Sequence, residues 1–195
     1  MNLSGNTQNS PVLVAFGANL PLDGQAPAET IAQALQALQS EGLALVAVSR
    51  LYRSPAFPAG AGPDYVNGAV EVSGAATHDV AALLALLHRV EARFGRERRQ
   101  RWGQRTLDLD LLAAGESVLP DAATQDRWRH LAPEVQQAEA PDRLILPHPR
   151  LQDRAFVLVP LADIAPVWRH PRLGLTVQDM LAALPEADRA ALVPL

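Results

Sequence analysis

Residues 96–112 read Arg-Glu-Arg-Arg-Gln-Arg-Trp-Gly-Gln-Arg-Thr-Leu-Asp-Leu-Asp-Leu-Leu. From position 106 the residues alternate, which predicts a strand with its leucines on one face and with Asp108 and Asp110 together on the other. Side chains two apart on a strand lie roughly 7 Å from each other, and two bare carboxylates at that distance repel by about 2 kcal/mol at an effective dielectric constant of 20. A divalent cation removes this penalty, and carboxylate oxygens suit Mg2+.

The segment before this strand is dense in arginine. Guanidinium groups bind phosphate oxygens in a fixed fork geometry, so arginines beside two carboxylates are typical of a site for nucleotide phosphate and magnesium. The alternative is that the two carboxylates form the solvated face of an edge strand and that the arginines only solubilise the chain. Asp is depleted in strands, which favours the functional interpretation. The arginines concerned are Arg96, Arg98, Arg99, Arg101 and Arg105.

The composition of the chain excludes several kinds of catalysis and argues against some classes of partner. The chain has 195 residues, 48% of them hydrophobic, which is enough for one substantial core. All 17 basic residues are arginine, so a lysine phosphate loop and Schiff-base catalysis are excluded. There is no cysteine, which excludes disulfides and thiol catalysis, and the net charge of −4 argues against a general nucleic-acid or membrane-surface binder. No apolar run approaches a membrane span, and no signal peptide is evident, so we expect a cytoplasmic protein.

The hydrophobic pattern predicts the order strand, helix, strand, strand, helix, strand. This is the split β-α-β order of ferredoxin-like α+β domains, in which helices cover one face of an antiparallel sheet and the other face is free for ligands. We expect a flexible tail at 1–11, a single domain at 12–195, a surface insertion at about 120–142 and a C-terminal extension with a helix at 176–184. The expected elements are strands at 12–16, 43–52, 65–73 and 106–112 and helices at 27–40 and about 80–94.

Several separated motifs, in this order, resemble those of the 6-hydroxymethyl-7,8-dihydropterin pyrophosphokinases of folate biosynthesis. The resemblance spans roughly 12–184, and its most specific block is Arg101-Trp102-Gly103-Gln104-Arg105-Thr106-Leu107-Asp108-Leu109-Asp110. The supporting blocks are Phe16-Gly17-Ala18-Asn19-Leu20, Tyr52-Arg53-Ser54-Pro55, Pro63-Asp64-Tyr65-Val66-Asn67, Leu146-Pro147-His148 and Arg154-Ala155-Phe156.

The resemblance implies that ATP donates its β- and γ-phosphates together to the hydroxymethyl oxygen of the pterin, releasing AMP. It implies that Asp108 and Asp110 bind two Mg2+ ions and that Arg96 and Arg105 contact phosphates or stabilise transition-state charge. It places Arg98 and Trp102 on a loop that folds over the substrates.

The resemblance also implies two binding regions. In the pterin region two aromatic rings sandwich the heterocycle, and an amide reads its edge. The matching pterin residues are Ser54, Pro55, Phe57, Tyr65, Asn67 and Phe156. The matching nucleotide residues are Glu91, Arg98, Trp102, Arg143, His148 and Arg154.

The chain departs from the family pattern at a few positions. Gln104 stands where the family usually has proline, and Ala18, Ile145 and Pro149 replace other common residues, which affects nucleotide-side details. Two other functions stay open: a ferredoxin-like module for single-stranded nucleic acid, against which the acidic pair and the negative net charge argue, and a paralogue that binds pterin or nucleotide without catalysis. We expect a monomer with small-molecule substrates and no nucleic-acid or membrane partner.

Overall fold

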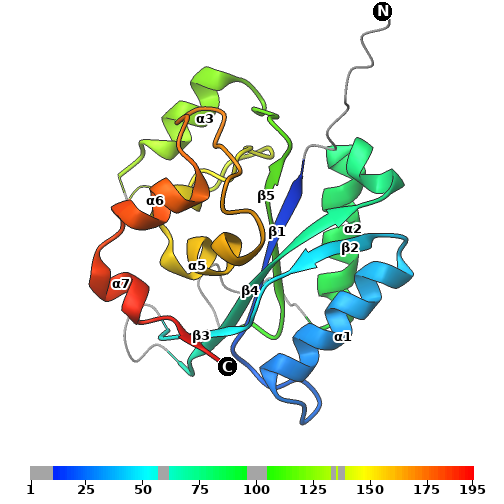
Figure 1. The fold of residues 1–195 in the computed structure, drawn as a ribbon. Helices are drawn as coiled ribbons and strands as arrows, with labels where there is room; N and C mark the ends of the chain where they lie inside the picture. Colours follow the sequence, from blue (N-terminus) through cyan, green and yellow to red (C-terminus); the bar gives the residue numbers. More distant parts are fainter. Residues whose placement is uncertain (1–10, 57–61, 96–104, 133–134, 136–138) are drawn as a thin grey trace, which may run out of the picture.

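A computed structural model describes residues 11–56, 62–95, 105–132, 135 and 139–195, and its centre is a six-stranded antiparallel sheet (Figure 1). The strand order is β5-β1-β4-β3-β6, and β2 also pairs with β4. This confirms the α+β class. The strands are β1 (Val12–Ala18), β2 (Ala44–Val48), β3 (Tyr52–Ser54), β4 (Tyr65–Ser73), β5 (Asp108–Ala114) and β6 (Val193–Pro194).

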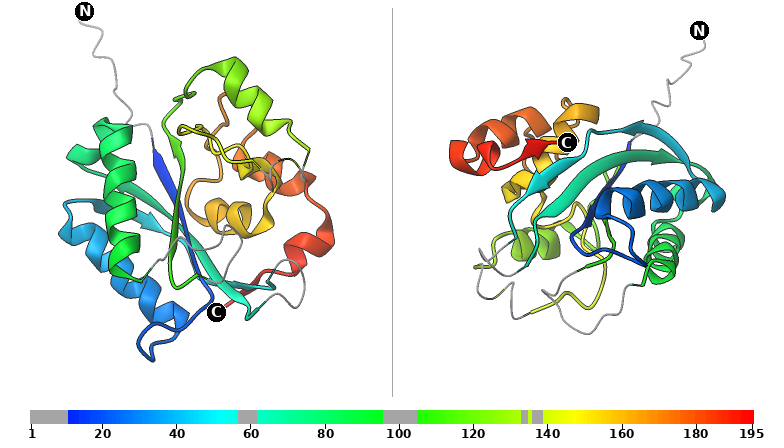
Figure 2. Two further views of the ribbon diagram at one scale, coloured as in Figure 1. Left: turned by 180° about the vertical axis from the view of Figure 1, so that it is seen from behind. Right: turned by 90° about the horizontal axis from the view of Figure 1, so that it is seen from below.

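Helices lie on both faces of this sheet (Figure 2). The helices α1 and α2 cover one face, as expected, whereas α5 and α6 from the C-terminal part pack on the other. The second face is therefore only partly open to ligands. The helices are α1 (Pro27–Ser40), α2 (Val80–Arg93), α3 (Ala122–Arg129), α5 (Ala155–Ile164), α6 (Val177–Ala183) and α7 (Glu186–Ala190), with short 3-10 turns η1 (Ala75–His78) and η2 (Leu151–Asp153).

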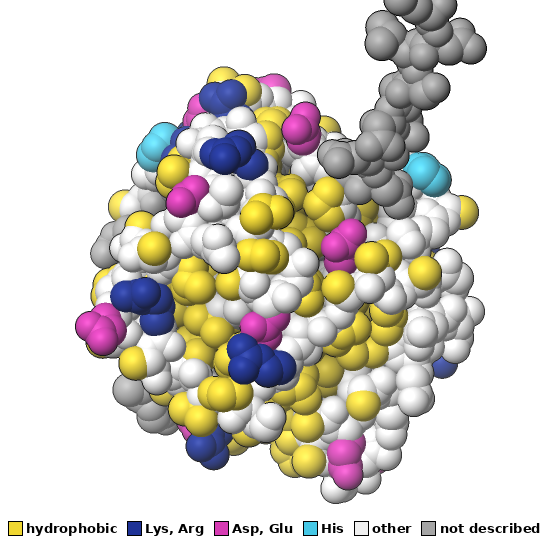
Figure 3. All heavy atoms as spheres, in the orientation of Figure 1, with side chains coloured by type: hydrophobic (Ala, Val, Ile, Leu, Met, Phe, Trp, Pro, Cys, Tyr) yellow, Lys and Arg dark blue, Asp and Glu magenta, His cyan; other side chains and the backbone are white. Residues whose placement is uncertain are grey.

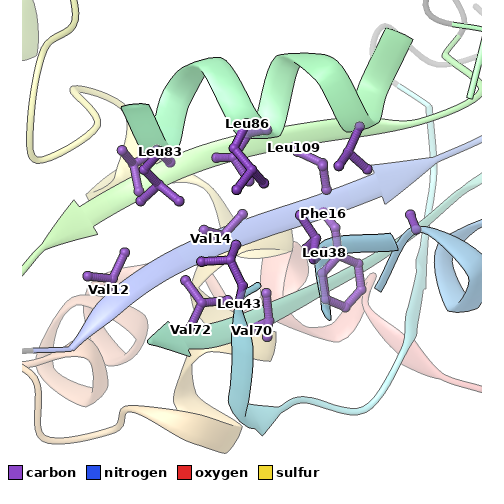
Figure 4. Close-up of a cluster of buried hydrophobic side chains, with 14 of the residues drawn as sticks. Val12, Val14, Phe16, Leu38, Leu43, Val70, Val72, Leu83, Leu86 and Leu109 are labelled. Atoms are coloured by element: carbon purple, nitrogen blue, oxygen red, sulfur yellow. The ribbon is translucent and has the colours of Figure 1, made fainter. Parts of the chain in front are cut away.

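Each face of the sheet has its own hydrophobic core, because strand side chains alternate between faces. Val14, Phe16 and Leu109 point toward α1 and α2, where they meet Leu38 and Leu86 (Figure 4). The other core contains residues from β1, β4 and β5 together with α5 and α6, and its members include Leu13, Ala69, Leu112, Val157, Leu158, Leu161 and Met180. The alternation predicted for β5 is thus confirmed, with Leu109 and Leu111 in the first core.

One expectation about elements was wrong. The strand expected at 43–52 is two strands, β2 and β3, which both pair antiparallel with β4 and are separated at 49–51, where the Ser49 hydroxyl accepts from the amide of Ala69 at 2.9 Å. The surface insertion expected at about 120–142 stays a prediction, and within it α3 has a side that faces the interior. Gln125 and Trp128 of α3 are buried, and the Gln125 amide donates to the carbonyl of Pro147 at 3.2 Å.

His170 is a fully buried histidine outside the expected site. Its Nδ1 accepts hydrogen bonds from the amides of Arg172 and Leu173, at 3.1 and 3.2 Å, so the ring is neutral with its proton on Nε2. Burial, followed by the charge of Arg129, lowers the pKa of His170 to about 4. The charged groups around it are those of Arg129, Arg172 and Asp126.

This histidine should make the fold sensitive to acid. Because its pKa is lower in the folded state than the ordinary 6.5, its stabilising effect is complete above pH 6.5 and is lost as the pH falls toward 4. The loss should reach about 3 kcal/mol. Denaturant unfolding at pH 7 and at pH 4.5 would measure it. His170→Asn, which keeps an acceptor near Nδ1, should show a smaller drop than the wild type; an equal drop would assign the acid sensitivity to other groups.

Candidate active site

Strand register aligns four positions across the sheet. Gly17 of β1 pairs with Asp108 of β5 on one side and with Asn67 of β4 on the other, and Asn67 pairs with Tyr52 of β3. Paired residues direct their side chains to the same face, and neighbouring strands are about 4.8 Å apart. Asp108 and Asn67 therefore flank a glycine on the α5 face of the sheet, with their backbones about 10 Å apart.

Gly17 leaves this row open at its centre. A Cβ at this position would lie 2.9 Å from Oδ1 of Asn67, closer than a real Cβ contact. The amide of Asn67 is buried and donates from Nδ2 to the hydroxyl of Ser54 at 2.8 Å. Glycine at 17 thus provides the space in which the Asn67 amide oxygen lies, next to the acidic side of the row.

Asp108 and Asp110 share the α5 face of β5 and are both partly buried. Arg105 forms an ion pair with Asp108 through Nη1. Burial lowers the pKa of Arg105, but Asp108 and Asp110 outweigh this, and the net shift is upward. Arg105 therefore stays charged and lies in the field of both carboxylates.

The backbone of Arg105 is fastened to the end of β1. Oδ1 of Asn19 accepts from the Arg105 amide at 2.9 Å, and the Arg105 carbonyl accepts from the amides of Asn19 and Leu20 at 3.0 and 3.2 Å. The Asn19 side chain also donates to the carbonyl of Pro63 at 3.2 Å and is 3% exposed. Asn19 had no assigned role in the sequence analysis; the available signal was a polar residue directly after a buried strand.

Glu91 of α2 lies on the other side of β5. It is 1% exposed, and its Oε1 accepts from the backbone amide of Leu109 at 2.8 Å. That amide lies between the two aspartates, so Glu91 fixes the strand segment that carries them. The nucleotide contact expected for Glu91 stays a prediction.

Arg154 and His148 precede α5, and Phe156 lies in the first turn of that helix. Arg154 precedes α5 and places its guanidinium 5.6 Å from the ring centre of Phe156, which is 40% exposed. Burial lowers the pKa of Arg154, while Asp110 is the largest opposing influence. Burial and then Arg154 lower the pKa of His148 to about 3, with Asp108 opposing them, so its ring is neutral at pH 7.

The remaining predicted residues divide into three groups. Tyr65, whose pKa is raised by burial, interacts electrostatically with Arg105 and Asp108, and it pairs with Ser54 in the sheet; Pro55 follows Ser54 at the surface. Arg143 is exposed and paired with its neighbour Asp142 at 3.2 Å, and no described interaction links it to the acidic pair. Four expected residues lie outside the described residues: Phe57, Arg96, Arg98 and Trp102.

The donor set of the acidic pair fits a hard cation. Among the described residues no group of three or more histidine, aspartate or glutamate side chains gathers as a metal site, and Asp108 and Asp110 offer a pair of carboxylates on one face of β5. Mg2+ commonly takes one or two carboxylates and completes its shell with water and phosphate oxygens.

Within the described ranges no helix has the length and apolar character needed to cross a membrane.

Fold and site together define a class of α+β protein. Its antiparallel sheet carries a cluster of aspartates and arginine suited to nucleotide phosphates, and beside this cluster it carries an amide suited to a heterocycle. The sequence profile of 7,8-dihydro-6-hydroxymethylpterin-pyrophosphokinase (HPPK) matches residues 13–166. The chain belongs to this family.

Individual relatives agree. A 2-amino-4-hydroxy-6-hydroxymethyldihydropteridine pyrophosphokinase of Pseudomonas aeruginosa is 40% identical over 176 residues, which is 89% of this chain and 91% of that protein. The enzyme of the same name from Synechocystis is 39% identical over 140 residues, 72% of this chain, and the match spans 60% of that longer protein. The HPPK-DHPS of Plasmodium falciparum has the same fold, with a TM-score of 0.60 at 14% identity over 88% of this chain and 43% of that one.

Proposed function

We propose that this protein transfers the β,γ-diphosphate of ATP to the hydroxymethyl group of 6-hydroxymethyl-7,8-dihydropterin, giving AMP and the pterin diphosphate. The observation that carries the proposal is the row in which open Gly17 separates Asp108 from Asn67. It offers one place for phosphates and one for a heterocycle on the same sheet face. The names of the relatives support this substrate pair.

In the proposed reaction the hydroxymethyl oxygen attacks the β-phosphorus and forms a new O–P bond. The bond from the β-phosphorus to the α,β-bridging oxygen breaks, AMP leaves with that bond's electron pair, and the hydroxyl proton passes to solvent. Asp108 and Asp110 would hold two Mg2+ ions, which would neutralise phosphate charge and orient the attacking and leaving oxygens. Arg105, held by Asn19, would stabilise charge on the phosphates.

The pterin would bind on the Asn67 side of the row. Asn67 supplies both a donor and an acceptor for the edge of the ring, Ser54 fixes the orientation of that amide, and Tyr65 and Phe156 would stack on the two faces of the heterocycle. Pro55 and Phe57 would complete the pocket. On the nucleotide side, Arg154 and His148 interact electrostatically with the acidic pair, and Arg96, Arg98, Trp102, Glu91 and Arg143 are expected to contribute.

Phe156→Ala should weaken pterin binding by about tenfold and ATP binding much less, because stacking of a flat ring on an aromatic side chain contributes about 1–3 kcal/mol. The side chain is 40% exposed, so its truncation should cost little stability. Calorimetric titration with each substrate measures both affinities. Val167→Ala, a truncation at an apolar residue that is 77% exposed, is the matched control. Equal weakening of both substrates would contradict the stacking role.

The function itself is tested by product analysis. Purified protein with ATP and Mg2+ should release AMP only when 6-hydroxymethyl-7,8-dihydropterin is present, and mass spectrometry should find the pterin diphosphate in equal amount. Release of ADP would indicate an ordinary kinase or ATPase instead. Pterin binding without turnover would favour a catalytically inactive relative. The monomeric state and the cytoplasmic location remain predictions.

A further inference from the structure

A carboxylate outside the site just described connects two of the segments that border the site. Asp163 accepts four hydrogen bonds: Oδ2 from the Arg50 amide and Nε at 3.2 Å each and from the Tyr52 hydroxyl at 2.9 Å, and Oδ1 from Arg50 Nη2 at 2.9 Å. The Arg50 guanidinium also lies 5.3 Å from the centre of the Tyr52 ring. We call Arg50, Tyr52 and Asp163 the Asp163 clamp.

The clamp connects segments that are more than 100 positions apart in the chain. Arg50 lies in the short link between β2 and β3, Tyr52 begins β3, and Asp163 lies in the last turn of α5. This link is joined to β4, because Ser49 accepts from the Ala69 amide, and the Ser49 hydroxyl also donates to the Arg50 carbonyl at 2.7 Å. In Figure 3 basic and acidic side chains meet near the centre of the face shown, among hydrophobic atoms.

At its β3 end the clamp acts on the Asn67 side of the site. Tyr52 is opposite Asn67 in the sheet, and Ser54, two residues along β3 on the same face, accepts the Asn67 amide hydrogen bond. A shift of β3 relative to β4 would therefore move Ser54 and change the direction of the Asn67 amide.

At its helix end the clamp acts on Phe156. Asp163 and Phe156 belong to the same helix and are seven residues apart, about 10 Å along its axis. The helix packs on β4 and β3 through apolar side chains. These nondirectional contacts fix the distance of the helix from the sheet, but only loosely its rotation about its own axis and its position along that axis. The four directional hydrogen bonds at Asp163 fix the rotation and the axial position of the helix, and thereby the position of Phe156.

The acidic pair is held by other contacts. Arg105 is fastened by Asn19, which follows β1, and β5 by Glu91 of α2, and neither of these hydrogen bonds involves a clamp residue. Loss of the clamp should therefore disturb one half of the site and leave the other half in place.

We propose that Asp163 is a positioning residue for the pterin pocket, which it acts on through Tyr52 and through α5. The inference rests on the proposed function, because it names which of the two substrates the clamp serves. Arg50 is mostly exposed, with 65% of its side chain accessible, so its ion pair with Asp163 adds little to overall stability.

The test compares Asp163→Ala and Tyr52→Phe with the wild type in steady-state kinetics, well below the unfolding temperature of each variant. Asp163→Ala should raise KM for the pterin by about tenfold and change KM for ATP by less than about twofold. Tyr52→Phe, which removes only the hydroxyl, should shift pterin KM in the same direction by less. The double variant should be no worse than Asp163→Ala, because both changes remove the same contact.

Glu41→Ala is the matched control, since Glu41 accepts ion pairs from Arg89 and Arg93 on the α1 and α2 face. Calorimetric titration with pterin alone gives a readout independent of turnover. Lower thermal stability of Asp163→Ala and Tyr52→Phe with both KM values unchanged would overturn the positioning role, as would equal changes for the two substrates. Wild type that neither binds pterin nor releases AMP would overturn the proposed function and this inference together; active wild type with unaffected variants overturns the inference alone.

Discussion

Asp110→Ala is expected to lower the rate of pterin-dependent AMP release by about 10³-fold while the protein stays folded. The two carboxylates lie on the α5 face of β5, and in the proposed reaction each would hold a cation against the triphosphate. Asp110 pairs with Ala15 in the sheet, so its truncation removes charge without disturbing the Arg105–Asp108 ion pair. Asp108→Ala should be as inactive and also removes the partner of Arg105.

The metal role can be separated from a purely structural one. Calorimetric titration of Mg2+ with a nonhydrolysable ATP analogue should show weaker metal uptake by Asp110→Asn, which preserves shape but not charge. Asp64→Ala is a suitable control, because Asp64 is exposed and its contact with Arg53 is 3.9 Å long. Near-normal turnover in both Asp108→Ala and Asp110→Ala would rule out the magnesium assignment.

Local patterns were enough to predict β1, β4, β5 and the two helices on the first face of the sheet, but not the break between β2 and β3 or the short strand β6. The alternation around Asp108 and the helical spacing in α1 and α2 each act within one segment, and the structure agrees with each. Helix α5 was missed, because Pro160 lies inside it and proline normally ends a helix. Its apolar residues fit the second core well enough to override that preference. Because α5 was missed, the second face of the sheet was expected to be more open to ligands than it is.

The site was predictable only as a set of residues. That Asp108, Gly17, Asn67 and Tyr52 form one row depends on register between strands far apart in the chain, and a shift of one residue would send each side chain to the opposite face. Supporting contacts were missed for the same reason. Asn19, for example, acts on Arg105 across 86 positions, and no pattern within one segment encodes such a pairing.

Arg105→Ala should reduce kcat by about 10²-fold with a smaller effect on ATP affinity, because a guanidinium that meets developing phosphate charge acts mainly in the transition state. The backbone of residue 105 is held by Asn19 whatever its side chain, so the segment leading into β5 should keep its conformation. Arg105→Lys should recover only part of the loss, because an ammonium lacks the planar fork that binds two oxygens. Single-turnover measurements separate this effect from product release.

A competing account makes Arg105 only the counter-ion of Asp108. On that account its removal would leave a partly buried carboxylate more available to Mg2+, and added metal would restore turnover. The two roles therefore differ in a magnesium titration of Arg105→Ala: a rate that stays low at saturating Mg2+ supports contact with the phosphates, and recovery to the wild-type rate refutes it. Arg53→Ala, at an exposed arginine whose contact with Asp64 is 3.9 Å long, should behave as wild type throughout.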